Sequence, residues 1–203
     1  MATNEILNSR LNCSLVEIRL WDTRTGELLV EPIQSQTSQL NVLAFSQDSQ
    51  VLATVGCGYI YRDYECDQGE VRVYDVASGQ PLAQPMADHT ENVVGLAFSP
   101  DGKMLASLSD EKNLILWDTS QWHALGQLNS EDGWMPNYQY FMAFSPDNYH
   151  LYLASGVLSD YSVGPQQWKA AACQIANRDL TQVEWEQYLP DQPYQTVCPV
   201  QNP

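Results

Sequence analysis

Positively charged residues are scarce in this sequence: Lys and Arg together number 9, against 25 Asp and Glu, and the formal net charge is −16. Nucleic acids and anionic membrane surfaces are bound through positively charged surfaces. A chain this acidic is a poor candidate for either ligand, so we predict no nucleic-acid partner and no membrane partner. The acidity is most simply interpreted as a solvated surface.

Long apolar runs are missing as well. The N-terminal stretch "MATNEILNSRLNCSLVEIR" has no basic segment followed by an apolar one, and no later segment is apolar over the length that a bilayer requires. We therefore expect a protein of the cytoplasm.

Cysteines are few, and their number is odd. The 5 cysteines, Cys13, Cys57, Cys66, Cys173 and Cys198, share no spacing that would indicate the disulfide framework of a small secreted protein. In a reducing cytosol we expect free thiols that pack as small hydrophobic side chains. The sequence leaves open whether Cys57 pairs with Cys66, or Cys173 with Cys198.

Motifs of catalysis are also absent from the sequence. It has no G-x-S-x-G, no Gly-rich loop ending in Gly-Lys-Ser/Thr, no H-E-x-x-H and no C-x-x-C. Neighbouring carboxylates such as Glu131 and Asp132 are better explained by a solvated loop than by a general acid and base, which need opposed environments. We predict a protein that is not an enzyme and has no catalytic residue, cofactor or metal ligand.

What the sequence does contain is an internal repeat. Ala-Phe-Ser, followed two residues later by Asp, occurs three times, and so does an aliphatic stretch that ends in an aromatic residue and Asp. The first signature lies at residues 44–48, 97–101 and 143–147, and the second reads "IRLWD" at 18–22, "VRVYD" at 71–75 and "LILWD" at 114–118. The distance from each aromatic residue to the next Phe is 24, 24 and 27 residues, so the two signatures keep a constant phase.

One insertion separates the copies. Phe45 and Tyr74 are 29 residues apart, whereas Phe98 and Trp117 are 19 apart, and the stretch "CGYIYRDYECD" at 57–67 accounts for the difference. Without it the period falls to 43 residues. A period of about 40–45 residues with a Trp-Asp ending is typical of a four-stranded propeller blade.

Each copy is expected to hold four short strands joined by tight turns. In one copy these are "NVVGLAF", "KMLASLS", "LILWD" and a strand within "TSQWHALGQL". Such a unit cannot bury both faces alone and must stack on its neighbours. We predict an all-β fold of about three and a half blades over residues 1–163. It begins partway through one blade and ends in a fourth, whose third strand is not recognisable after "LYLASGVLSD".

These motifs resemble those of the WD-repeat family over most of residues 16–156, and the resemblance implies a partial β-propeller. In that family a hydrogen-bonded set of His, Ser or Thr, Asp and Trp braces a blade. In the copy at residues 88–118, His89, Ser107 and Trp117 match this set, and Glu111, beside Asp110, stands at the position of the Asp.

The brace is incomplete in the other copies, which have Gln36 and Met135 at the position of His89. We interpret His89 as a structural residue, because no second His or Cys lies near it at a spacing typical of metal ligands. We expect His123 and His150 to have no partner.

The insertion at 57–67 is the better candidate for function. It carries Tyr59, Tyr61, Arg62 and Tyr64, and Tyr and Arg are enriched in binding surfaces. Insertions in repeat units often lie on the binding face. The alternative is a lengthened β-hairpin, across which the two cysteines of the insertion would face each other in a disulfide or a metal clip.

The C-terminal segment, residues 164–203, predicts two short helices packed on the last blade. Pro165 takes a first helical position before "QQWKAAACQIAN", and a capping box of Thr181 and Glu184 begins a second helix near Gln182 that ends at Pro190. The anchors expected to hold this tail are Trp168, Cys173, Thr181, Glu184 and Trp185.

The stretch "ACQIANRDLTQVEWEQYLPDQPYQTVCP" resembles the tail of long bacterial, often cyanobacterial, WD-repeat signalling proteins. In those proteins a signal-transduction NTPase module precedes the propeller. The resemblance implies a fold and no chemistry, because these residues offer no base beside either cysteine.

A closed propeller needs about four to eight blades. We therefore expect an upstream part of a longer chain or self-association to complete the ring, or else edges that stay open. The function that we predict is a non-enzymatic scaffold that binds other proteins through its WD repeats. The alternatives are a sensor or regulatory segment of a larger signal-transduction NTPase and, from another class, a propeller-type enzyme.

Overall fold

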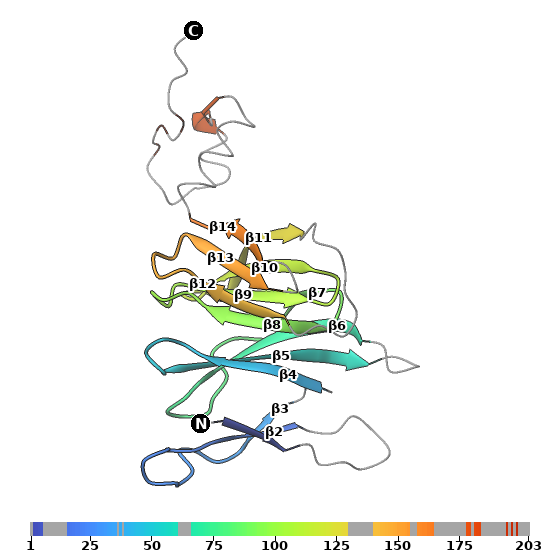
Figure 1. Ribbon diagram of the computed structural model, residues 1–203, viewed down its shortest axis with the longest axis vertical. Helices are drawn as coiled ribbons and strands as arrows, with labels where there is room; N and C mark the ends of the chain where they lie inside the picture. Colours follow the sequence, from blue (N-terminus) through green and yellow to red (C-terminus); the bar gives the residue numbers. More distant parts are fainter. Residues whose placement is uncertain are drawn as a thin grey trace.

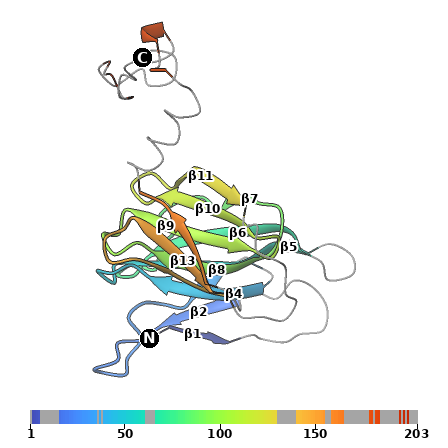
Figure 2. The ribbon, with the colours of Figure 1, turned by 45° about the horizontal axis from the view of Figure 1, so that its top comes forward.

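The computed structural model shows four antiparallel β-sheets that follow one another in chain order (Figures 1 and 2). The residues that it describes are 2–5 (backbone only), 16–35, 37, 39–60, 66–129, 140–154, 158–164, 178–179, 181–183, 194, 196 and 198. No helix among these residues has the length and apolar character needed to cross a membrane.

Two of the sheets have four strands and two have three. The first holds β1 (Ala2–Glu5), β2 (Val16–Leu20) and β3 (Ile33–Ser35), and the second β4 (Gln39–Phe45), β5 (Val51–Ile60), β6 (Cys66–Asp75) and β7 (Met86–His89). The third holds β8 (Val93–Phe98), β9 (Met104–Ser109), β10 (Asn113–Asp118) and β11 (His123–Asn129), and the fourth β12 (Phe141–Phe144), β13 (His150–Ala154) and β14 (Leu158–Ser162). For the described residues this confirms an all-β fold with four-stranded units.

The third strand of the last unit, which the sequence did not reveal, is β14. It pairs with β13 from His150↔Ser162 to Ala154↔Leu158. The sequence "LSDYS" did not identify it as a strand, because it lacks the aliphatic-aromatic-Asp ending of the other third strands. The first unit is also fuller than expected, since β1 pairs with β2 over four residues.

Three apolar cores hold the sheets together, one between each pair of successive sheets. Ile18 and Leu20 of the first sheet pack with Leu52 and Tyr74 of the second. The next core joins side chains of β5 and β6 to β8, β9 and β10, and the last joins β9 and β10 to β13. Alternate residues of one strand therefore serve two cores, which explains why each unit must stack on its neighbours.

The repeated Ala-Phe-Ser-x-Asp signature is a turn between the first two strands of a unit. The Ser99 hydroxyl donates to the Asp101 carboxylate at 2.7 Å and accepts the backbone N–H of Met104 at 2.9 Å. Ser46 makes the same two bonds with Asp48 and Val51, and Ser145 makes them with Asp147 and His150. The Ser hydrogen bond is the main cause that lowers the pKa of Asp48 and Asp147.

The Asp of the aromatic-Asp signature begins the other kind of turn. Asp75 Oδ1 accepts the backbone N–H and the hydroxyl of Ser78, and the hydroxyl bond is the first cause of a lowered pKa at Asp75. Asp118 makes the equivalent bonds with Ser120. Both repeat signatures are thus explained by turns, and the sequence repeats because the turns repeat.

Candidate protein-binding site

The insertion lengthens one hairpin of the second sheet. β5 and β6 each have 10 residues, whereas their counterparts β9 and β10 in the third sheet each have 6. Aligned on the Phe of the two copies, β5 continues beyond the frame of the blade from Cys57 to Ile60. The lengthened hairpin that the sequence left as an alternative is therefore present.

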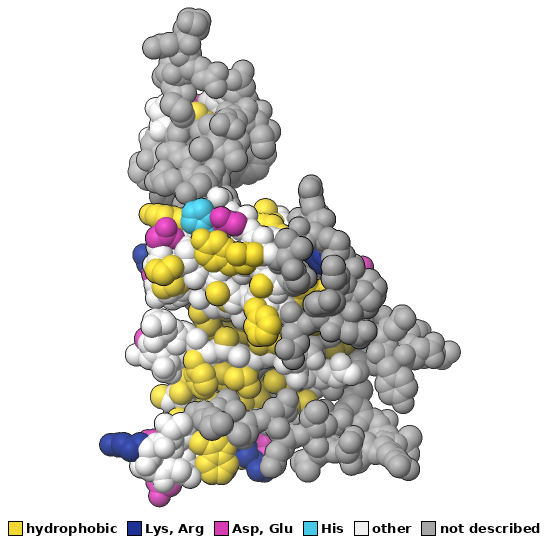
Figure 3. All heavy atoms as spheres, viewed as in Figure 1, with side chains coloured by type: hydrophobic (Ala, Val, Ile, Leu, Met, Phe, Trp, Pro, Cys, Tyr) yellow, Lys and Arg dark blue, Asp and Glu magenta, His cyan; other side chains and the backbone are white. Residues whose placement is uncertain are grey.

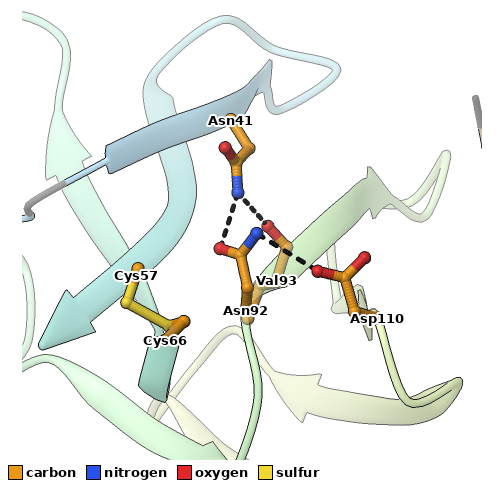
Figure 4. Close-up of a disulfide and its surroundings, with 6 residues drawn as sticks. All are labelled: Asn41, Cys57, Cys66, Asn92, Val93 and Asp110. Carbon is orange, nitrogen blue, oxygen red and sulfur yellow. Dashed lines mark hydrogen bonds between the residues drawn. A yellow bond between two sulfur atoms is a disulfide. The ribbon is translucent and has the colours of Figure 1, made fainter. Parts of the chain in front are cut away.

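A disulfide joins Cys57 to Cys66 at the base of this extension, with the two Cα atoms 5.7 Å apart (Figure 4). The expectation of free thiols is wrong for these two residues: they lie diagonally across the hairpin, whose register pairs Cys57 with Gly69 and Cys66 with Ile60. The β5–β6 pairing slips twice near the disulfide, between Cys57 and Tyr59 and between Tyr59 and Ile60. Bulges of this kind bend and twist a strand, and they are common beside functional sites.

Close contacts fix the base of the hairpin to a neighbouring loop. A Cβ atom on Gly69 would lie 1.9 Å from the carbonyl oxygen of Glu91, which belongs to the loop between β7 and β8. Only glycine allows this approach of two backbones. The loop at 90–92 therefore lies against the hairpin, and the two cannot move independently.

A polar bridge links the second and third sheets beside the disulfide (Figure 4). Asn41, the bulged residue of β4, donates its amide to Asn92 Oδ1 at 2.7 Å and to the Val93 carbonyl at 2.8 Å. Asn92 in turn donates to Asp110 Oδ2 at 3.3 Å. Partial burial raises the pKa of Asp110, while the Asn92 bond acts in the opposite direction.

An ion pair supports the hairpin on the face of β6 opposite to Gly69. Arg72 donates through Nε and Nη2 to the two carboxylate oxygens of Glu70, at 2.6 and 3.2 Å, and the Glu70 side chain is 7% exposed. A Cβ on Gly58 would lie 2.8 Å from the Glu70 carboxylate, so this pair occupies the space above the glycine. The bidentate geometry orders both side chains.

The brace residues His89, Ser107 and Trp117 meet between the second and third sheets. His89 Nε2 and Ser107 Oγ share a hydrogen bond of 2.6 Å, and Trp117 Nε1 donates to the same hydroxyl at 2.8 Å. All three side chains are buried, and burial lowers the pKa of His89 to about 4. His89 Nδ1 has no hydrogen-bond partner among the described residues.

Glu111 lies outside this set of hydrogen bonds. It is exposed, and its carboxylate accepts the Thr90 hydroxyl at 3.3 Å. His150, expected to be unpaired, lies 2.9 Å from the Asp160 carboxylate through Nδ1. The missing third strand explains that error, because Asp160 belongs to β14.

The remaining candidate residues fall largely outside the described part of the chain. Tyr59 lies in β5, but its side chain is not described, and Tyr61, Arg62 and Tyr64 are not described at all. Of the tail anchors, Thr181 is described, and Trp168, Cys173, Glu184 and Trp185 are not. Cys198, also expected as a free thiol, forms a disulfide as well.

The polar bridge formed by Asn41 and Asn92, called the asparagine bridge from here on, was not predicted from the sequence. A weak signal was present: in both copies an Asn-Val pair lies shortly before the repeated Phe, in "QLNVLAF" with Asn41 inside β4 and in "TENVVGLAF" with Asn92 just before β8. The bulge that turns Asn41 toward the next sheet depends on backbone register, which residue types alone do not reveal.

Residues 79–118 match the family model of the WD domain, G-beta repeat. This segment is therefore similar to a WD repeat, and it contains His89, Ser107 and Trp117. Among the described residues, no three His, Cys, Asp or Glu side chains gather in a way that could hold a metal ion.

The chain is also similar to curated proteins, some of which are named for WD repeats. It is 34% identical over 102 residues to the target of rapamycin complex subunit wat1 of Schizosaccharomyces pombe, which is 50% of this chain and 29% of the relative. It is 34% identical over 106 residues to the human WD repeat and SOCS box-containing protein 1, covering 51% and 22%. The match to that protein in Takifugu rubripes is 31% over 141 residues, covering 64% and 27%. The chain thus spans less than a third of the length of these relatives.

Proposed function

We propose that this chain is a non-enzymatic scaffold that binds other proteins, and that the hairpin of β5 and β6 is its main binding element. The observation that carries the proposal is the construction of the hairpin base. A disulfide, a backbone contact and an asparagine bridge all hold a segment that the blade itself does not need. A rigid support lowers the ordering cost that a binding loop incurs when a partner docks.

The chemistry of the insertion supports the same proposal. Tyr59, Tyr61, Arg62 and Tyr64 offer large contact areas with few rotatable bonds, as is common in binding hot spots. WD repeats are the class of fold to which the similar proteins point, and one of those relatives is by name a subunit of a complex. We extend that role, assembly with protein partners, to this chain.

Four finer points complete the proposal. We assign residues 1–163 to the repeat domain and 164–203, which lie largely outside the described residues, to a helical tail expected on the last blade. The sheets belong to a propeller that another part of a longer chain or a second copy completes. The motif at 172–199 supports a relation to the tails of bacterial WD-repeat signalling proteins. A cytoplasmic location fits the function, although the disulfides argue for an oxidising step after synthesis.

The test replaces Tyr59, Tyr61, Arg62 and Tyr64 together by Gly and Ser. We expect unchanged folding by circular dichroism and loss of the partner that the parent captures from native lysate. The matched control is Glu111→Ser, in the corresponding turn of the third sheet, which should keep capture. Unchanged capture by the fourfold variant would mean that the hairpin is structural only.

A further inference from the structure

One turn of the molecule breaks the repeat at a position that calls for glycine. Gly26, Gly79 and Trp122 close the same turn in three successive units, and each donates its N–H to the carbonyl of the Asp four residues earlier at 2.8 Å. Their φ angles are 73°, 71° and 55°. Glycine adopts this conformation readily, whereas a bulky L-residue is disfavoured there. A tryptophan held in this conformation suggests that its side chain has a role.

The space around the turn differs between the units in the same way. A Cβ on Gly79 would lie 3.2 Å from Val30 and 3.3 Å from Ile33 of the preceding unit, so that position has little room. The second unit follows the first at an offset of 53 residues, so the equivalents of Val30 and Ile33 are Ala83 and Met86. Both line a groove together with Trp122. Ala83 is smaller than Val30, and Ala83 and Trp122 both pack, partly buried, against the core between the second and third sheets.

The groove lies between the second and third sheets and has a volume of about 420 Å³. One wall is the segment 83–88, which includes most of β7, and the other is the start of β11 with the turn before it. β7 is the last strand in the order of its sheet, so its outer edge offers backbone groups to an added strand. Trp117 and Met86, both buried, form apolar lining.

The charge of the groove indicates the kind of side chain that fits it. Asp88 is exposed and lines the groove, and no Lys or Arg is among the lining residues. An aromatic ring beside a carboxylate attracts a cation through both its π face and the opposite charge. The net charge of −16 favours approach of a basic partner over an acidic one.

We propose that this groove binds an extended segment of a partner protein that presents a Lys or Arg side chain. The segment lies along β7, Trp122 provides the aromatic platform, and Asp88 provides the counter-charge. The inference rests on the proposed scaffold function, in that it assumes a protein partner, and it adds a second contact with defined chemistry.

The test measures binding of two fluorescein-labelled peptides by anisotropy, one of alternating Val and Lys and one of alternating Val and Glu. We expect the parent to bind the Lys peptide only. Trp122→Gly, which restores the glycine of the two preceding turns, should weaken binding about tenfold. Trp122→Phe, which keeps an aromatic ring, should retain a larger part of the affinity.

Charge reversal at the groove keeps the test decisive if Trp122→Gly does not fold. Asp88→Lys should abolish binding of the Lys peptide. Its matched control, Glu27→Lys, makes the same change of net charge at an exposed turn of the first unit and should bind as the parent does. Equal loss in both variants would mean nonspecific attraction and would overturn the proposal.

The two proposals can fail separately. If neither peptide binds the parent while the fourfold hairpin variant still loses its captured partner, the groove proposal is wrong and the scaffold function stands. Peptide binding that Trp122→Gly and Asp88→Lys both leave unchanged would also overturn the groove proposal.

Discussion

Ser107 carries more of the contact between the second and third sheets than its size suggests. Its hydroxyl is the meeting point of His89 from one sheet and Trp117 from its own. The residue at the same place one unit earlier is Thr54, which is also buried, but its hydroxyl has no partner among the described residues. One position of the repeat thus has a satisfied hydroxyl in one copy and an orphaned one in the other.

This difference predicts opposite effects for two similar substitutions. Ser107→Ala removes the partner of two buried groups and should lower the free energy of unfolding by about 1–3 kcal/mol. Thr54→Val removes only an unsatisfied hydroxyl of nearly equal volume and should be neutral or stabilising. Urea denaturation of both variants beside the parent measures the contrast. Equal destabilisation would show that the hydrogen bonds of Ser107 contribute little.

His89 predicts a dependence of stability on pH. Burial lowers its pKa to about 4, below the value of about 6.5 in the unfolded chain, so between these values the unfolded state binds more protons. The contribution of neutral His89 is complete above pH 6.5 and is lost as pH falls toward 4, by roughly 3 kcal/mol.

Many carboxylates titrate in the lower part of this window, so the measurement is a comparison. The difference in free energy of unfolding between parent and His89→Gln should shrink as pH falls from about 6.5 to about 4. A difference that stays constant over this range would contradict the assigned shift.

At the scale of elements, the hairpin of β5 and β6 depends on its disulfide. Cys57 is fully buried in β5, where the extension begins, and Cys66 begins β6. Replacing both by Ala should lower the free energy of unfolding by about 2–3 kcal/mol, the value expected for a short closed loop.

The double variant is a better test than a reducing agent, because Cys198 is also disulfide-bonded. Thermal unfolding in the same oxidising buffer compares the variant with the parent. If the two melt together, the disulfide adds nothing to the packing of the hairpin base.

The turns and strands differ in how far sequence alone could predict them. The Ala-Phe-Ser-x-Asp and aromatic-Asp turns were predictable, since each depends on side chains that hydrogen-bond within their own turn. β14 was not, because it lacks those residues and is a strand through its pairing with β13. The brace was expected from its motif, whereas the asparagine bridge depends on a bulge and the groove depends on which residues two sheets bring together.

At the scale of the whole molecule, the outward face of the fourth sheet is the unusual surface. Phe141 is 67% exposed and Leu158 68%, and both pair with Ala154 of the central strand, so they form one apolar row. Figure 3 shows that other hydrophobic side chains lie between the sheets, and that Lys and Arg, in dark blue, are sparse on the coloured surface of this view. An exposed apolar row favours association.

We therefore predict that Phe141→Ser with Leu158→Ser reduces self-association without unfolding the chain. Surface substitutions of this kind usually change stability by less than about 0.5 kcal/mol. Light scattering over a range of concentrations should give a smaller average mass for the double variant, and a control with Leu125→Ser, another exposed apolar residue, should match the parent. An average mass equal to that of the parent would remove this face as the contact.

The faces of the sheets also determine how many copies can join. Ala53 and Ala106 lie at the centre of the faces that the second and third sheets turn toward the sheet that follows. The residue at the same place on the outward face of the fourth sheet is Tyr152, which stacks on His150. The first sheet presents a Glu17–Arg19 ion pair on its outward face. A second copy that completes the ring must make head-to-tail contacts, in which that ion pair meets the apolar row and has to keep its own hydrogen bonds. Two copies that meet through the fourth sheet alone close on themselves instead, so growth stops at a pair and no ring is completed.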